Sequence, residues 1–237
     1  MKVISVYARL YARCLVEALA GVGRNLWTLA LPMSLGIGLY FVAVLVSPLG
    51  RAGGILVAFA ESAALSIWSY FSSEVVAHSK VGLSDFPRAI RSYFWSWVSL
   101  SFVLYILNLL VSTALANNPN RDGALTALNL ITLVALTAAP EVITQKGTRT
   151  GLDTIQRSFA FLQETWIEWF IPNLLILGGA YLFVTRVMPG LSGPAVLLSI
   201  LGACAVAHVV AVFRGHLFRE LDGSTHRQRM YRFRTGG

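Results

Sequence analysis

The sequence predicts an all-α integral membrane protein with six transmembrane helices and three amphipathic helices that lie on the membrane surface. Hydrophobic residues make up 56% of the chain and charged residues only 13%, whereas about a quarter of the residues in an average soluble domain are charged. Because these apolar stretches occupy about half of the chain, we expect residues 1–237 to form a single transmembrane domain. Six segments approach the roughly 20 apolar residues that a spanning helix needs: Leu26–Val46, Ile55–Val76, Trp97–Leu115, Ala124–Ile143, Trp169–Val187 and Ala195–Phe213.

Basic residues are distributed unevenly between the predicted connections. Sixteen of the 19 Lys and Arg residues fall in the N-terminal segment, the second and fourth connections and the C-terminal tail. Only Arg51, Arg121 and Arg186 lie in or beside the other connections. Cytoplasmic loops carry an excess of Lys and Arg, so we predict that both termini are cytoplasmic, which agrees with six crossings.

This topology also accounts for the formal net charge of +8, so the composition does not require a nucleic-acid partner. The basic residues of Arg214–Arg234, most of them in a tail of residues 216–237, are expected to contact anionic lipid headgroups. RNA, a ribosome or an acidic protein is the alternative partner for this tail. Cys14 is predicted on the cytoplasmic side and Cys204 inside the last span, so we expect no structural disulfide.

The first surface helix is predicted over residues 3–24, and the first span follows it. One helical face carries Leu10, Tyr11, Cys14, Leu15 and Ala18, and another carries Arg9, Arg13 and Glu17. Pro32 lies in the first turns of the span, where a missing backbone donor costs least. Residues 47–54 form a glycine-rich outer turn before the second span.

The second and third surface helices are predicted over residues 82–96 and 151–166. The second has Asp85 as a candidate N-cap and Pro87 in its first turn, and the third leads into a span that contains Pro172. Spacings of 69, 70 and 140 residues relate glycine, proline and tryptophan positions along the chain. This self-similarity favours three parallel repeat units, each a surface helix plus a hairpin, over residues 3–80, 82–146 and 150–215, with a basic tail over 216–237.

Polar side chains within the spans could line a pathway for an ion, a proton or a small solute. Glu61 is the first candidate, because an ionisable group at membrane depth is costly and often functional. The alternative is that these residues only form hydrogen bonds between helices, with Glu61 protonated or paired. The candidate residues are Glu61, Ser62, Ser66, Asn108, Asn129 and Asn173.

A second polar group is expected at the cytoplasmic ends of the helices, formed by Glu74, His78, Glu141 and His208. A metal site needs three or four ligands at fixed geometry, so we interpret this group as a network that anchors helix ends. We expect no metal and no cofactor. The chain also lacks a Gly-x-Ser-x-Gly, His-Glu-x-x-His, Walker or Cys-x-x-Cys motif, so we predict no enzymatic activity and no catalytic residues.

A longer pattern runs through the second half of the chain. Gly-Leu-Asp-Thr-Ile-Gln-Arg-Ser-Phe is followed, after six residues, by Trp (Gly151–Trp166); Ala139–Glu141 precedes it and Phe213–Leu221 closes it. This pattern resembles the YciC-like group of six-span bacterial proteins, which are allied to the membrane domain of some glycerophosphodiester phosphodiesterases. The resemblance implies a bundle in the bacterial inner membrane and carries over no catalytic residue. A looser similarity to the CysZ type of sulfate permease keeps transport open.

We therefore expect a non-enzymatic accessory or structural subunit that docks to other integral membrane proteins. Faces of small residues allow close approach between helices in a membrane, and two such faces are Ala58, Ser62 and Ser66, and Ala203, Ala207 and Ala211. The alternative is a small-solute or ion permease with Glu61 in the pathway.

Overall fold

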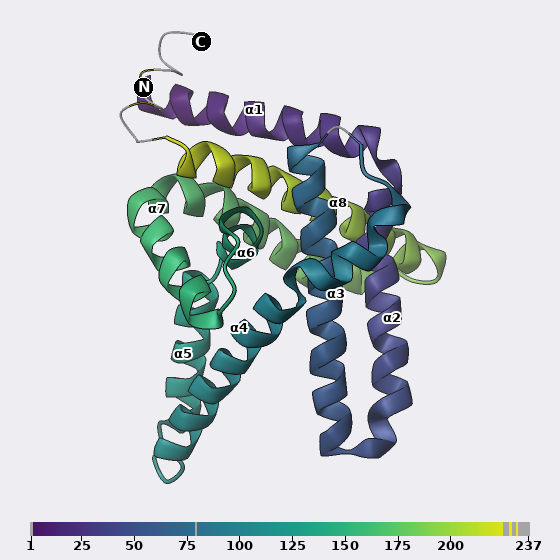
Figure 1. Cartoon of the computed structure of the whole chain (residues 1–237), viewed down its shortest axis with the longest axis vertical. Coiled ribbons are helices and arrows are strands. Elements are labelled where there is room, and N and C mark those ends of the chain that lie inside the picture. Colours follow the sequence, from purple (N-terminus) through teal and green to yellow (C-terminus); the bar gives the residue numbers. More distant parts are fainter. Residues whose placement is uncertain (1, 79, 225–227, 229–230, 232–237) are drawn as a thin grey trace. The chain divides into compact units, whose positions relative to one another are not determined.

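Helices make up all of the regular secondary structure in the part of the chain that the structure describes (Figure 1). The computed structural model describes residues 2–78, 80–224, 228 and 231. Its helices are α1 (Lys2–Arg24), α2 (Leu31–Val46), α3 (Arg51–Ala77), α4 (Phe86–Ala114), α5 (Arg121–Ala135), α6 (Ala139–Lys146), α7 (Gly151–Leu182) and α8 (Pro194–Asp222). The predicted all-α class is confirmed.

Six helical stretches of the described chain are long and apolar enough to cross a membrane, which confirms the predicted number of spans. Each overlaps one of the segments predicted from the sequence. The stretches are Leu26–Leu49, Arg51–Ala77, Leu83–Ala114, Arg121–Lys146, Gly151–Gly190 and Pro194–Asp222. The chain is therefore a polytopic membrane protein.

The amphipathic segments differ in how they join their spans. The first is the separate helix α1, but the other two run directly into α4 and α7. The backbone of α7 leaves helical geometry at Thr165 (φ −131°, ψ 18°). That is one residue before Trp166, where the sequence predicts that the surface segment ends. The last span also continues to Asp222, so residues 216–222 of the predicted tail are helical; Arg227, Arg229, Arg232 and Arg234 lie outside the described residues.

The fourth span is interrupted. α5 ends at Ala135 and α6 begins at Ala139, with Pro140 in the first turn of α6. Proline has no backbone N–H and disfavours helical geometry at the residue before it, so a continuous helix through this point would lose a hydrogen bond. α6 then ends at Gly147, whose left-handed backbone (φ 65°, ψ 40°) suits glycine at a helix C-terminus.

The chain forms two compact units, each built from separate segments. One comprises Met1–Gly38, Phe71–Gly82 and Glu164–Gly237, and the other comprises Leu39–Tyr70 and Leu83–Gln163. We call these the α1–α8 unit and the α4–α6 unit. Their boundaries are not those of the predicted repeat units, and the threefold repeat stays a prediction.

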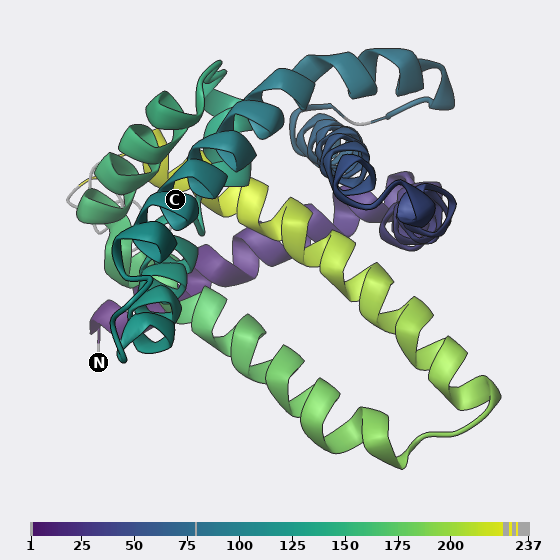
Figure 2. The ribbon, with the colours of Figure 1, turned by 90° about the horizontal axis from the view of Figure 1, so that it is seen from below.

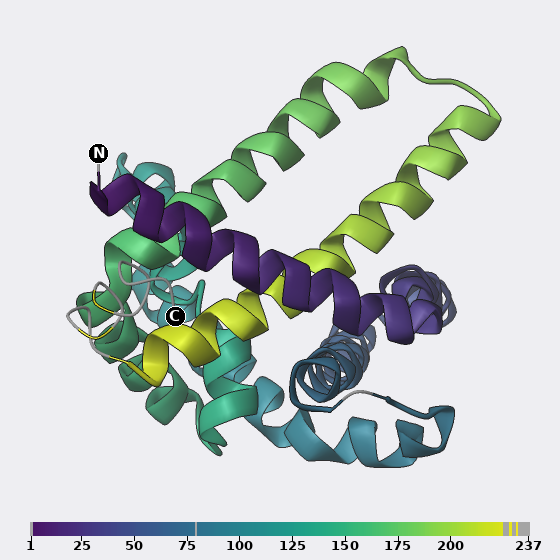
Figure 3. The same ribbon diagram turned by 90° about the horizontal axis from the view of Figure 1, so that it is seen from above.

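In the α1–α8 unit, α1 runs across α8 (Figures 2 and 3). Its inner face recurs every fourth residue: Val6, Leu10, Cys14, Ala18 and Val22 are all buried. Leu15, predicted on this face, is 44% exposed, because the observed stripe follows the four-residue spacing and Leu15 lies to one side of it. Burial of this stripe holds α1 on the unit through the hydrophobic effect.

The core of the α4–α6 unit lies between α4 and α6. It consists of Trp97, Leu100, Ala139 and Ile143, with Leu65, Tyr93, Leu104, Leu136 and Ile155 packed against it. Trp97 also donates a hydrogen bond from its indole nitrogen to Ser69 Oγ of α3, at 3.2 Å. This core positions the polar groups described next.

Candidate functional site

Two serines of the predicted pathway lie in a helix-packing interface. Ser66 Oγ donates to the carbonyl oxygen of Ala89 at 2.8 Å and accepts a hydrogen bond from the amide nitrogen of Tyr93 at 3.1 Å, so it joins α3 to α4. Ser62 is buried and donates to the carbonyl of Ala58 on its own helix. The predicted docking face of Ala58, Ser62 and Ser66 is therefore largely occupied within the chain.

The asparagines are bound to their own helices or exposed. Asn108 donates to the carbonyl of Leu104 at 3.1 Å, and the buried Asn173 donates to that of Trp169 at 2.6 Å. Asn129, on α5, is exposed. Side chains that bond to a carbonyl one turn earlier satisfy their donors locally and add no polar lining elsewhere.

Glu61 is the only ionisable residue in this group of six. It is exposed on α3, and it makes no hydrogen bond or ion pair with any residue in the described part of the chain. A charge at the bilayer centre costs about 2.5–3.5 kcal/mol on insertion scales. The apolar residues around Glu61 offer it neither an opposite charge nor a hydrogen bond that would offset this cost.

Two members of the predicted cytoplasmic-end group, Glu74 and His78, lie together. His78 Nδ1 lies 2.8 Å from a carboxylate oxygen of Glu74, one turn away on α3. His208 is fully buried in α8 of the same unit, and Glu141 is buried in α6 of the other unit. No group of three or more His, Cys, Asp or Glu residues with metal-site geometry occurs among residues 2–78 and 80–224.

Sequence reasoning missed a polar cluster where α1 crosses α7 and α8. Tyr11 donates its phenolic hydrogen to the carbonyl of Glu168 at 3.0 Å. Glu17 lies 3.0 Å from Arg13 Nε on its own helix and 3.3 Å from His216 Nδ1 of α8. The sequence does not reveal this cluster, because its residues come from three segments that are far apart in the chain.

The environment of α1 raises two of its pKa values. Burial, followed by the nearby charge of Glu168, raises the pKa of Tyr11. Burial, followed by the charge of Glu17, raises the pKa of the Cys14 thiol to about 12. Since the thiolate is the reactive form of cysteine, this burial disfavours reaction of Cys14 at neutral pH.

Aromatic and basic side chains pack together at the same crossing of α1, α7 and α8. Trp169 is fully buried, and its ring meets that of Phe218 edge to face, with centroids 6.2 Å apart. The guanidinium carbon of Arg214 lies 5.2 Å from the Trp169 ring centroid, within cation–π range. Arg219 donates to the carbonyl of Val76 at 3.2 Å. Arg214 and Arg219 therefore have contacts within the protein, at the start of the segment predicted to bind headgroups.

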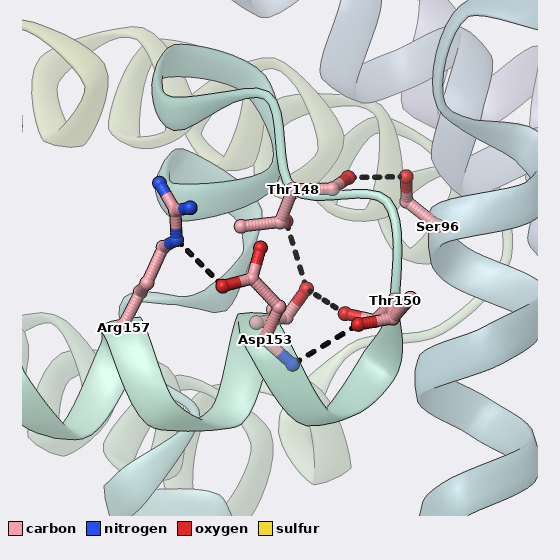
Figure 4. A network of polar contacts seen from close by, with 6 residues as sticks. Ser96, Thr148, Thr150, Asp153 and Arg157 are labelled. Carbon is pink, nitrogen blue, oxygen red and sulfur yellow. Dashed lines mark hydrogen bonds and ion pairs between the residues drawn. The ribbon is translucent and has the colours of Figure 1, made fainter.

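A network of hydroxyl groups anchors the loop between α6 and α7 (Figure 4). Ser96 of α4 donates to the carbonyl of Thr148 at 2.7 Å, and the hydroxyls of Thr148 and Thr154 lie 2.8 Å apart. The amide of Asp153 donates to Thr150 Oγ1 at 3.2 Å, and the carboxylate of Asp153 accepts from Arg157 Nε at 2.7 Å. Thr148 and Thr154 are buried, so these bonds satisfy groups that would otherwise be costly.

The first residue of α7 completes this anchor. The amide of Gly151 donates to Ser99 Oγ at 2.8 Å. A Cβ at this position would lie 2.6 Å from the Ser99 carbonyl oxygen and 2.8 Å from Leu100 Cα. Only glycine fits, so the start of the motif that carries the family resemblance is a point of close backbone contact.

Apart from the Arg157–Asp153 bond within α7, every hydrogen bond of this network connects a helix to a loop or to another helix, so the arrangement acts by fixing backbone positions. No known family model, curated protein or solved structure matches the chain. The resemblance to the YciC-like group stays a prediction.

Proposed function

We propose that this protein is a non-enzymatic accessory or structural subunit of a larger complex in the bacterial inner membrane, with both termini cytoplasmic. The main support for the proposal is that only a small part of each span is buried by the rest of the chain. Only 6% of the most apolar window of the first span and 17% of that of the last span are buried inside the molecule. Such surfaces are available to lipid and to other transmembrane helices.

The α8 helix offers the surface best suited to a partner helix. Ala203 is exposed, and Ala207 and Ala211 are half-buried. Helices associate in membranes through van der Waals packing and close approach, which small residues permit. Exposed Leu198 and Val206 flank this face.

The hydrogen bonds that polar side chains of the spans make within the chain also favour a subunit over a permease. A transport route requires polar groups that remain available to the solute. Ser66 instead connects α3 to α4, and Asn173 bonds within α7. We also propose that the chain belongs to the YciC-like group. The support is Gly151, the first residue of the motif, because its close contact with the backbone of α4 leaves no room for a side chain.

Gentle extraction from the native membrane tests the proposal. The protein should co-purify in mild detergent with another integral membrane protein at fixed stoichiometry, and a monodisperse lone protein would contradict the proposal. Reconstituted vesicles test the alternative: ion or solute uptake that is abolished by Glu61→Gln would make the protein a permease.

A further inference from the structure

Glu61 lies near the middle of its span. It is the tenth residue after Arg51, where α3 begins, and a rise of 1.5 Å per residue places it about 15 Å along the helix. The hydrocarbon core of a bilayer is about 30 Å thick. With Arg51 at the outer edge of this core, the carboxylate lies close to the bilayer centre, where a charge is costly.

The surface around Glu61 is apolar. Its neighbours three and four residues away, which share its side of the helix, are Val57, Ala58, Ala64 and Leu65. Of these, Ala58 is exposed and Val57 is half-buried, whereas Ala64 is buried and Leu65 packs against the core of the α4–α6 unit. A single carboxylate thus stands beside an exposed alanine on an otherwise apolar helix face.

No described residue of the α4–α6 unit supplies this carboxylate with a cation. None of the ion pairs in the described chain includes Glu61, and the nearest basic residue along α3 is Arg51, about 15 Å away. A second copy of the chain is a poor partner, because a twofold interface through this face would bring two Glu61 carboxylates together. Charge complementarity instead requires a positive group from a different protein.

We propose that the face of α3 around Glu61 docks a transmembrane helix of a partner protein that carries an arginine or lysine at mid-depth. The proposal rests on the proposed function and names the chemistry of the partner. An ionisable group within a membrane is accommodated by pairing with an opposite charge, and removal from water strengthens that attraction. Ala58, the exposed apolar neighbour of Glu61, then packs against the partner helix.

Asn129 provides a second point of polar contact in the same unit. It is exposed on α5, eight residues after Arg121, so it lies about 12 Å along its helix, at nearly the depth of Glu61. It too makes no hydrogen bond with the residues that the structure describes.

Synthetic helices test this directly. The full-length protein, labelled at its C-terminus with a donor fluorophore, is reconstituted in phosphatidylcholine vesicles with an acceptor-labelled polyleucine peptide that carries one central arginine. We expect this peptide to associate at least tenfold more tightly than the matched all-leucine peptide. Glu61→Leu should abolish the difference, Glu61→Asp should retain it, and Phe59→Leu, on the same helix, serves as the control. Equal association of the two peptides with the wild-type protein, or an undiminished preference in Glu61→Leu, would overturn the proposal.

Two results keep this proposal separate from the proposed function. A native complex that survives Glu61→Leu would leave the subunit role intact and refute the role of Glu61. An arginine preference that depends on Glu61, in a protein that purifies alone, would support the docking face and refute the subunit role. Circular dichroism and gel filtration of Glu61→Leu in detergent show whether the variant is folded.

Discussion

Gly151 and Ser99 hold the start of α7 against α4: the Gly151 amide donates to Ser99 Oγ at 2.8 Å, with the two backbones in direct contact. Gly151→Ala should lower the free energy of unfolding by about 1–3 kcal/mol, the usual cost of overpacking. Thermal unfolding in detergent measures this loss. Gly178→Ala is the control, because a Cβ at Gly178 meets nothing within 4 Å; equal effects of both changes would contradict the predicted contact.

Ser66→Ala should loosen the contact between α3 and α4. The change removes a hydroxyl that both donates to Ala89 and accepts from Tyr93. A loss of about 1–2 kcal/mol in the free energy of unfolding is expected for buried hydrogen bonds of this kind. Ser112→Ala is matched to it, since Ser112 bonds only to the carbonyl of Leu109 on its own helix. If the two variants unfold alike, Ser66 does not join the helices.

Cys14 should resist alkylation in the folded protein. Burial raises its pKa from 9.0 to about 12, so at pH 8 the folded protein carries roughly a thousandfold less thiolate than the unfolded chain, and a membrane-permeant maleimide should react much more slowly with it. A Cys204→Ala background leaves Cys14 as the single thiol. Reaction at equal rates before and after unfolding would show that α1 does not bury this residue.

The same shift has a consequence for stability at high pH. The unfolded thiol loses its proton near pH 9 and the folded thiol near pH 12, so the unfolded state binds fewer protons between these values. The contribution of Cys14 to the free energy of unfolding therefore falls as pH rises from 9 to 12. Cys14→Ala should show a shallower decline than the wild-type protein over this range.

The predicted orientation can be checked with single cysteines in a background that lacks Cys14 and Cys204. Asn118→Cys, between α4 and α5, should react with a membrane-impermeant maleimide added to intact cells. Thr150→Cys, between α6 and α7, should react only after the inner membrane is opened. The opposite pattern would invert the orientation that the positive-inside rule predicts.

The sequence predicts the number and position of the spans because hydrophobic length is a local property. Each observed stretch overlaps its predicted segment, and the bend of α7 at Thr165 lies beside the predicted end of the surface helix at Trp166. The break before Pro140 follows from the missing backbone donor. These features depend on residues close together in the chain.

The direction in which each side chain points is not predictable in the same way. Glu61 and Ser62 are adjacent, but Ser62 is buried and Glu61 is exposed. Trp169 lies completely inside the crossing of α1, α7 and α8, with Arg214 against its ring. The rotation of a helix is set by the helices that pack against it, and the side chains that contact the Trp169 ring, Arg214 and Phe218, lie more than 40 residues further along the chain.

Native mass spectrometry of the protein, extracted gently from its own membrane, tests the subunit role most directly. The wild-type protein and the Phe59→Leu control should each carry a partner protein at fixed stoichiometry, and the Glu61→Leu variant should lose it. A wild-type protein that appears alone or only as copies of itself would contradict the account.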